Sequence, residues 1–211
     1  MRKLLNLAVW AGPCAGYWLF LRPQLLKWGT VLGEGQRRLP GDEVVPAPNQ
    51  QITQAVNIKA PPSVVWAWLA QMGRDHTGWY GIDWLGNQGV PSATYLRDDI
   101  PPPEVGMRAD AGYQILRVEP GRVLVFGGFD VPLVFVHGDV SLAYVLEPRR
   151  EGTRLLARMR LLSYGKAGGL LNKALFEWVD ALELRQQLIG IRARVEAIGH
   201  SAEAAAPVGD A

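Results

Sequence analysis

The stretch "MGRDHTGWYGIDWLGN", residues 72–87, gathers several side chains that could take part in chemistry. Asp75 and His76 are adjacent in sequence, so their side chains need not face each other, and we interpret the pair as exposed loop. Asp83 stands among apolar residues. If it is buried, it needs partners or a raised pKa and becomes a candidate acid; at a surface, such an aspartate caps a helix or a turn. Both interpretations of Asp83 stay open.

The aromatic residues of this stretch suggest a binding surface. Trp79, Tyr80 and Trp84 are spaced like a short amphipathic turn. They could form the wall of a cavity, in which the Tyr O–H and the Trp N–H hold the polar end of a ligand. The alternative is ordinary core packing of large aromatic side chains.

Glu177 is a further candidate, because it lies on the apolar face of a predicted long helix. A carboxylate in such a place costs free energy unless it is paired or reaches water. It could point into a solvated cavity and bind a polar group of a ligand. It could equally form a structural salt bridge with Arg154, Arg158 or Arg160.

The sequence lacks the features that are typical of several classes of function. The chain has 22 basic and 20 acidic residues, a net charge of +2 and no basic stripe with interleaved aromatics, which argues against nucleic-acid binding. The three histidines are scattered, and H-E-x-x-H, G-x-S-x-G, P-loop and dinucleotide-binding motifs are absent from the sequence. We therefore predict no metal, no cofactor and no catalytic residue.

The N-terminus carries an apolar run. Residues 4–21 contain no charge and would span ~27 Å as a helix, close to the thickness of a bilayer core. We favour a membrane anchor over a cleaved signal peptide, a lipoprotein site at Cys14 or a buried core helix. Counting the flanking basic residues places the single-pass domain on the cytoplasmic side. Three prolines and an acidic pair in "LPGDEVVPAPNQ" predict that residues 23–50 are an extended linker.

The sequence also predicts the strands and helices that position these candidate residues. Residues 51–60 predict a strand, and a helix then begins at Pro61 and ends at Gly73. Residues 74–111 are irregular, and short β-rich runs separated by Gly and Pro come next. The alternation in 152–162 predicts an antiparallel strand with one buried face and one basic, solvated face.

A long helix is predicted from about residue 169 to residue 198, with a wide apolar arc in its first half. Residues 199–211 are predicted to be a disordered tail. The domain organisation is thus an apolar transmembrane helix (1–22), the linker, a globular domain (51–198) and the tail.

Two segments carry a family resemblance, "APPSVVWAWLAQMG" (60–73) and "GWYGIDWLGN" (78–87). Four more add to it: "LRPQLLKWG" (21–29), "LPGDEVVP" (39–46), "AYVLEP" (143–148) and "GTRLLARMR" (152–160). Over residues 22–198 the chain resembles the SRPBCC superfamily, which includes START domains and polyketide cyclases, in its bacterial membrane-tethered type. The resemblance implies an α+β helix-grip fold: a curved antiparallel β-sheet wrapped around a long C-terminal helix, here preceded by an N-terminal transmembrane helix. It also implies an internal cavity for an apolar or aromatic small molecule.

The expected function is a membrane-anchored domain that binds a lipid, an isoprenoid or a polyketide-class molecule. One alternative is an accessory subunit that contacts other membrane proteins through residues 4–21. Another is a cyclase or dehydratase in which Asp83, Tyr80 or Glu177 exchanges protons; enzymatic activity is the less favoured interpretation. The predicted ligand-binding residues are Trp68, Trp79, Tyr80, Asp83, Trp84, Tyr144, Glu177 and Trp178.

Overall fold

The computed structural model describes residues 16–132 and 137–204. Its elements, in chain order, are η1 (Tyr17–Leu21, a π-helix), α2 (Arg22–Leu26), β1 (Gln50–Ile58), α3 (Pro62–Ala70), α4 (Asp83–Gly86), β2 (Gln114–Glu119), β3 (Val123–Pro132), β4 (His137–Arg149), β5 (Gly152–Ser163) and α5 (Lys166–Ala204).

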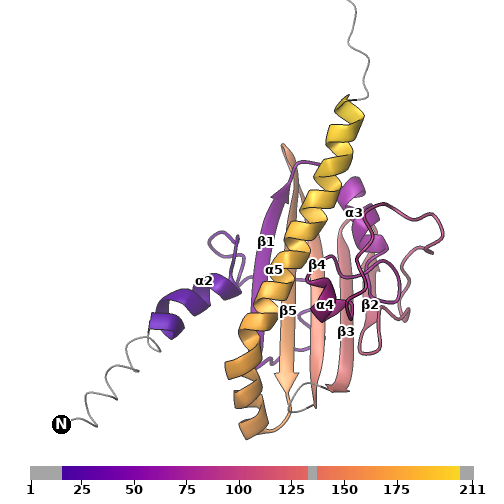
Figure 1. Ribbon diagram of the computed structural model, residues 1–211. Helices are drawn as coiled ribbons and strands as arrows, with labels where there is room; N and C mark the ends of the chain where they lie inside the picture. The colour runs from indigo at the N-terminus through magenta and orange to yellow at the C-terminus, as the bar shows by residue number, and fades with distance from the viewer. Residues whose placement is uncertain (1–15, 133–136, 205–211) are drawn as a thin grey trace, which may run out of the picture.

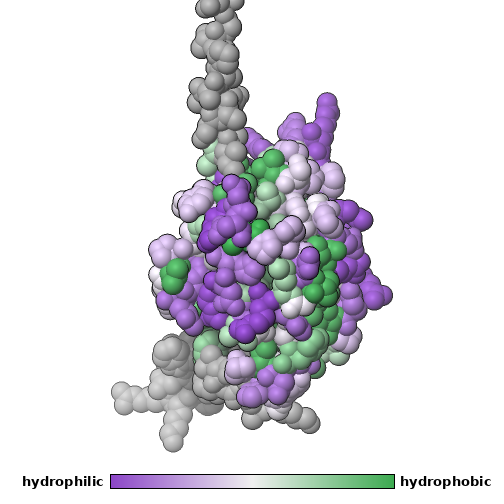
Figure 2. All heavy atoms as spheres, turned by 90° about the vertical axis from the view of Figure 1, so that its right-hand side faces the viewer, coloured by the Kyte–Doolittle hydropathy of each residue, from purple (hydrophilic) through white to green (hydrophobic). Residues whose placement is uncertain are grey.

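The strands form one antiparallel sheet in the order β1-β5-β4-β3-β2, and α5 runs along one face of it (Figure 1). This arrangement confirms the predicted α+β helix-grip architecture. The predicted strand at 51–60 and the helix after Pro61 correspond to β1 and α3, with bounds that differ by a few residues. The side of the molecule away from α2 is mostly hydrophilic, with one hydrophobic band (Figure 2).

The main core lies between the inner face of the sheet and α5. Alternate residues of β5, such as Leu155 and Ala157, are completely buried there. The helix contributes Ala181, Leu184, Leu188, Ile191 and Val195, all buried, at intervals of three or four residues. This spacing places their side chains on a single face of a helix. The predicted apolar stripe therefore positions α5 on the sheet.

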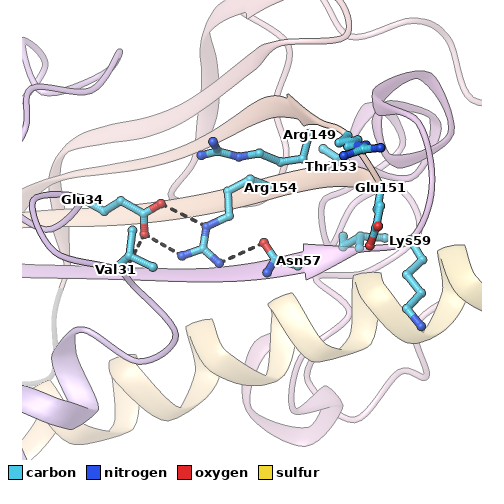
Figure 3. Close-up of a pocket in the computed structure, with 10 residues that line it drawn as sticks. Val31, Glu34, Asn57, Lys59, Arg149, Glu151, Thr153 and Arg154 are labelled. Atoms are coloured by element: carbon cyan, nitrogen blue, oxygen red, sulfur yellow. Dashed lines mark hydrogen bonds and ion pairs between the residues drawn. The ribbon is translucent and has the colours of Figure 1, made fainter.

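The outer face of the sheet carries a row of arginines on β5. Arg154 and Arg158 are only 6% and 2% exposed, because the chain from residue 29 to residue 46 crosses this face. Glu34 accepts two hydrogen bonds from Arg154, at 3.0 and 2.6 Å (Figure 3). Arg158 donates to Thr53 Oγ1, to Asp42 Oδ2 and to the carbonyls of Glu34, Gly35 and Arg37.

Two predictions were wrong here for one physical reason. Arg154, Arg158 and Arg160 were predicted to face solvent, and residues 23–50 were predicted to form an extended linker. Instead, the segment begins with α2, and its carboxylates and backbone carbonyls cover the arginines, while Leu39 and Val45 are buried. A buried guanidinium requires hydrogen-bonding partners on several sides, and this segment supplies them.

The two ends of the chain extend beyond the described residues. Most of the predicted anchor, residues 1–15, lies outside them, as do residues 205–211 of the predicted tail. Among the helices that the structure describes, none is both long and apolar enough to cross a membrane. At the other end, α5 continues to Ala204, past residue 198 where the helix was predicted to end. The tail prediction was therefore wrong for residues 199–204.

We predict that Arg154→Ala destabilises the fold by about 3–5 kcal/mol, because it leaves the buried carboxylate of Glu34 without its cation. Urea unfolding measures the change. Arg122→Ala is the control: Arg122 pairs with Glu119 at 3.5 Å with a 75% exposed side chain, and its loss should cost about 0–1 kcal/mol. Equal losses for the two variants would contradict the structural role of the outer-face pair.

Candidate functional site

A cavity of about 410 Å³ lies between the inner face of the sheet and α5. The sheet contributes Leu142 and Met159, and α5 contributes Phe176, Val179 and a group of polar residues. The remaining wall comes from the irregular segment and from the approach to β2. The full lining is Arg74, Trp79, Leu85, Gly86, Asp110, Tyr113, Leu142, Met159, Phe176, Val179, Asp180, Glu183, Leu184 and Gln187.

A tight turn brings Trp79 into this wall. The backbones of Gly73 and Gly78 exchange hydrogen bonds of 3.1 and 2.8 Å, and both glycines have positive φ, which residues with a side chain rarely adopt. The indole N–H of Trp79 donates to Asp110 Oδ2 at 3.3 Å. Its ring meets those of Tyr113 and Phe126 edge to face. Trp79 is thereby held rigidly as an aromatic surface.

The irregular segment closes the cavity by lying directly on α5. The carbonyl oxygen of Tyr80 would be 2.0 Å from a Cβ atom at position 190, so Gly190 permits this approach. Two helical turns before Gly190, Glu183 Oε2 accepts a 2.9 Å hydrogen bond from the backbone N–H of Ile82. The backbone ahead of α4 is therefore fixed to the helix at two points.

The polar wall comes from one stripe of α5. Asp180, Glu183 and Gln187 stand at i, i+3 and i+7, which places them on the same helical face as Phe176. Gln50 Nε2 donates to Asp180 Oδ2 at 2.8 Å, and the hydroxyl of Tyr144 donates to Gln187. Each polar group thus has a protein partner that orients it.

Burial shifts the pKa of the two carboxyl groups in this stripe, Asp180 and Glu183. Burial raises the pKa of the Asp180 carboxyl to about 6, the hydrogen bond from Gln50 opposes the rise, and the nearby charges of Glu177 and Glu183 add to it. Burial likewise raises the pKa of Glu183. A carboxyl with a pKa near 6 exchanges protons close to neutral pH, so it can either donate or accept a hydrogen bond from a ligand.

A larger hollow of about 600 Å³ lies on the outer side, where β1 ends and β4 turns into β5. Arg154, Glu34 and Asn57 line it (Figure 3). The guanidinium of Arg154 is already occupied by Glu34 and, at 3.2 Å, by Asn57 Oδ1. Because these polar groups satisfy one another within the fold, we take the inner cavity as the candidate site.

Of the residues predicted to bind a ligand, Trp79 is the one that lines the inner cavity. Trp68, Tyr80 and Tyr144 are buried in the core beside it. The hydroxyl of Tyr80 lies 2.6 Å from that of Thr77 and is satisfied inside the protein. The hydroxyl of Tyr144 donates a hydrogen bond to Gln187, which lines the cavity. The core-packing interpretation therefore describes these aromatics, apart from Trp79.

Asp83 and Trp84 lie in α4 and play other parts. Asp83 begins that helix and accepts hydrogen bonds from Asn87 and Ser92, both 2.6 Å long. Burial raises its pKa, but these hydrogen bonds outweigh burial and hold the pKa below its usual value. Asp83 is thus a turn-stabilising carboxylate, as one interpretation had it, and a poor proton donor. Trp84 is 74% exposed.

Glu177 and Trp178 do not line the inner cavity. Glu177 is 2% exposed and accepts hydrogen bonds of 2.5 and 2.7 Å from Arg22 of α2. Glu177 thus forms a salt bridge, but the predicted partners Arg154, Arg158 and Arg160 were wrong. Arg154, Arg158 and Arg160 cannot reach it, because they project from the face of the sheet opposite α5. Trp178 is 45% exposed and lines a hollow with η1 and α2.

The sequence interpretation missed six polar residues of the cavity: Arg74, Asp110, Tyr113, Asp180, Glu183 and Gln187. A signal for three of them was present, since Asp180, Glu183 and Gln187 form a polar stripe beside the apolar stripe of the long helix. Asp110 and Tyr113 come from a loop whose path follows no local pattern. In the described residues, no group of three or more His, Cys, Asp or Glu could hold a metal ion.

Several solved structures are similar to this chain at low sequence identity. No protein-family model and no curated protein matches this sequence. Among solved structures, a protein from Rhodobacter sphaeroides is similar at 15% identity, with 72% of this chain and 96% of that chain covered and a TM-score of 0.46. The di-domain ARO/CYC StfQ from the steffimycin biosynthetic pathway is similar at 13% identity, 71% and 51% coverage and a TM-score of 0.46. A protein from Mesorhizobium loti shows 17% identity, 70% and 98% coverage and a TM-score of 0.44.

We predict that Asp180→Asn changes the pH dependence of stability. The pKa of Asp180 is about 6 in the folded protein, against an ordinary value of 3.8. Between these two values the folded protein holds a proton that the unfolded chain has released, so the stability of wild type falls as the pH rises from 3.8 to 6. The stability of the variant relative to wild type should therefore rise by about 2 kcal/mol between pH 4 and pH 7.5. Urea unfolding across that range measures this change, with exposed Asp98→Asn as the control. A flat difference for Asp180→Asn would contradict the assignment.

Proposed function

We propose that this chain binds a predominantly apolar small molecule in the cavity between the sheet and α5. The observation that carries the proposal is the cavity itself. Its volume of about 410 Å³ falls within the roughly 300–1,000 Å³ of small-molecule sites. Its walls are largely apolar or aromatic, from Trp79, Leu142, Met159 and Phe176. Such walls favour a lipid, an isoprenoid or a polyketide-class ligand.

The polar stripe of α5 gives this ligand an orientation. A hydroxyl, carbonyl or similar group at one end of the molecule would meet Asp180, Glu183 and Gln187, while its apolar body lies against Trp79 and the sheet. Few, convergent polar groups in an apolar pocket are the pattern that fixes orientation and selects among ligands. We therefore expect an amphipathic ligand rather than a pure hydrocarbon.

We further propose that the domain is tethered to a membrane by its N-terminal segment. The support is the uncharged run of residues 4–21, long enough at ~27 Å to cross a bilayer core. The balance of flanking basic residues favours a domain on the cytoplasmic side. A tether would keep the cavity close to the phase in which apolar ligands dissolve.

A second candidate function is acid–base catalysis of the cyclase or dehydratase type. The observation that favours it is Asp180, a cavity carboxyl whose pKa of about 6 suits proton transfer near neutral pH. The residues first considered for this role, Asp83, Tyr80 and Glu177, do not line the cavity. A third interpretation, an accessory subunit of a membrane complex, rests on the small residues of the N-terminal run.

We predict that Val179→Trp abolishes ligand retention, because the enlarged side chain grows from α5 into the cavity. The full-length protein is purified in mild detergent and its bound mass is measured by native mass spectrometry. Val90→Trp, on a 67% exposed side chain, is the matched control and should retain the ligand. An empty wild-type protein, or retention by Val179→Trp, would refute the proposal. Stoichiometric partner proteins with an empty cavity would favour the accessory subunit.

Asp180→Asn separates binding from catalysis once native mass spectrometry has identified the ligand. If the cavity only binds, the variant should hold the ligand and leave it chemically unchanged, as wild type does. If Asp180 exchanges protons in a reaction, we expect wild-type turnover that changes around pH 6 and falls about 10²–10⁴-fold in the variant. Retained turnover in Asp180→Asn would rule out this carboxyl as the catalyst.

A further inference from the structure

The helical segment η1 is apolar on every side. Trp18, Leu19, Phe20 and Leu21 follow one another, and their exposed fractions are 45%, 68%, 68% and 63%. Consecutive residues of a helix point in different directions around its axis, so a partner on one side could not cover all four. A helix that is hydrophobic all round belongs in a protein core or in a bilayer.

The apolar surface continues onto the first half of α5. Leu175 and Trp178 are each 45% exposed and lie one turn apart on that helix. Trp178 and Leu21 line the same hollow, of about 430 Å³, so η1 and α5 meet there. We call Trp18–Leu21, Leu175 and Trp178 the apolar patch. The opposite side of the molecule is mostly hydrophilic and carries one hydrophobic band (Figure 2).

The joint between the two parts of the patch is rigid. Arg22 directly follows the uncharged run, and its guanidinium forms a two-pronged ion pair with Glu177, which is 2% exposed. The same guanidinium lies 4.9 Å from the ring centroid of Trp18. Because Glu177 directly precedes Trp178 on α5, this ion pair holds the turn that carries Trp178 next to η1.

We propose that the apolar patch is embedded in the interface of a lipid bilayer, so that the first half of α5 rests against the membrane. This inference rests on the proposed N-terminal tether. A bilayer fits better than a second protein chain, because it can surround η1 on all sides. The uncharged run reaches the patch directly, and Trp beside Arg is typical of the membrane–water boundary.

The proposal assigns a geometry to ligand entry. Phe176, Val179 and Asp180 of the cavity lie on the same turns of α5 as Leu175 and Trp178. One helix, about 10–12 Å across with its side chains, therefore separates the cavity from the bilayer. An apolar ligand could pass between lipid and cavity around this helix without crossing a wide aqueous gap.

The test uses the full chain in lipid nanodiscs. In a Cys14→Ala background, the single introduced thiol of Leu175→Cys is labelled with an environment-sensitive fluorophore. Nitroxide-bearing lipids then report the depth of the label. We expect it about 5–10 Å into the headgroup and acyl boundary. Val105→Cys, at an exposed loop position (66%), is the control and should stay in water. Adding Trp178→Lys should move the Leu175→Cys label toward water without loss of helix by circular dichroism.

The outcomes separate this inference from the tether. If carbonate fails to extract the protein but the label at 175 stays in water, the inference is overturned and the tether stands. If the label at 175 reports an apolar environment but nitroxide lipids do not quench its fluorescence, protein rather than lipid covers the patch. That result would also overturn the inference. If carbonate extracts the protein from membranes, the tether fails and this inference falls with it; the ligand test on Val179→Trp is unaffected.

Discussion

The buried arginines of β5 impose the constraint on which the rest of the structure depends. A guanidinium cannot leave water without a full set of acceptors. Arg154 and Arg158 find theirs in Glu34, Asp42 and the backbone carbonyls of the segment between α2 and β1. That segment is thereby drawn across the outer face of the sheet. With one face closed by ion pairs, the apolar side of α5 packs on the other face, and the cavity forms there.

The cavity exists because the same turns of α5 both pack against the sheet and line an open space. The apolar stripe of α5 fills the space against β1 and β5, whereas the neighbouring stripe of Asp180, Glu183 and Gln187 leaves room for a ligand. The irregular segment then closes the space, with Trp79 as a rigid wall and Gly190 allowing the backbone to touch the helix. Burial disfavours the ionised form of a carboxyl group, and this effect raises the pKa of Asp180.

The Arg22–Glu177 ion pair links the N-terminal segment to the same helix. A buried carboxylate on the apolar side of α5 would be costly alone, and Arg22 compensates it. The direction in which η1 leaves the domain is set by this contact rather than by a free linker. In the function we propose, the ligand cavity and the membrane tether are therefore coupled through α5. One face of this helix lines the cavity, and another face contacts the N-terminal segment.

Local periodicity in the sequence predicted β1, α3, β5 and α5 with its apolar stripe, because spacing of two or of three to four residues depends only on backbone geometry. Trp79 was also predicted for the site. What covers each face was decided by tertiary structure alone. The same alternation that marked Arg154 as an outward residue fits both a solvated face and one covered by a distant segment. Likewise, Glu177 and Asp180 look alike in sequence. One became a structural ion pair and the other a cavity carboxyl, because only the folded chain brings Arg22 to the first and leaves space beside the second.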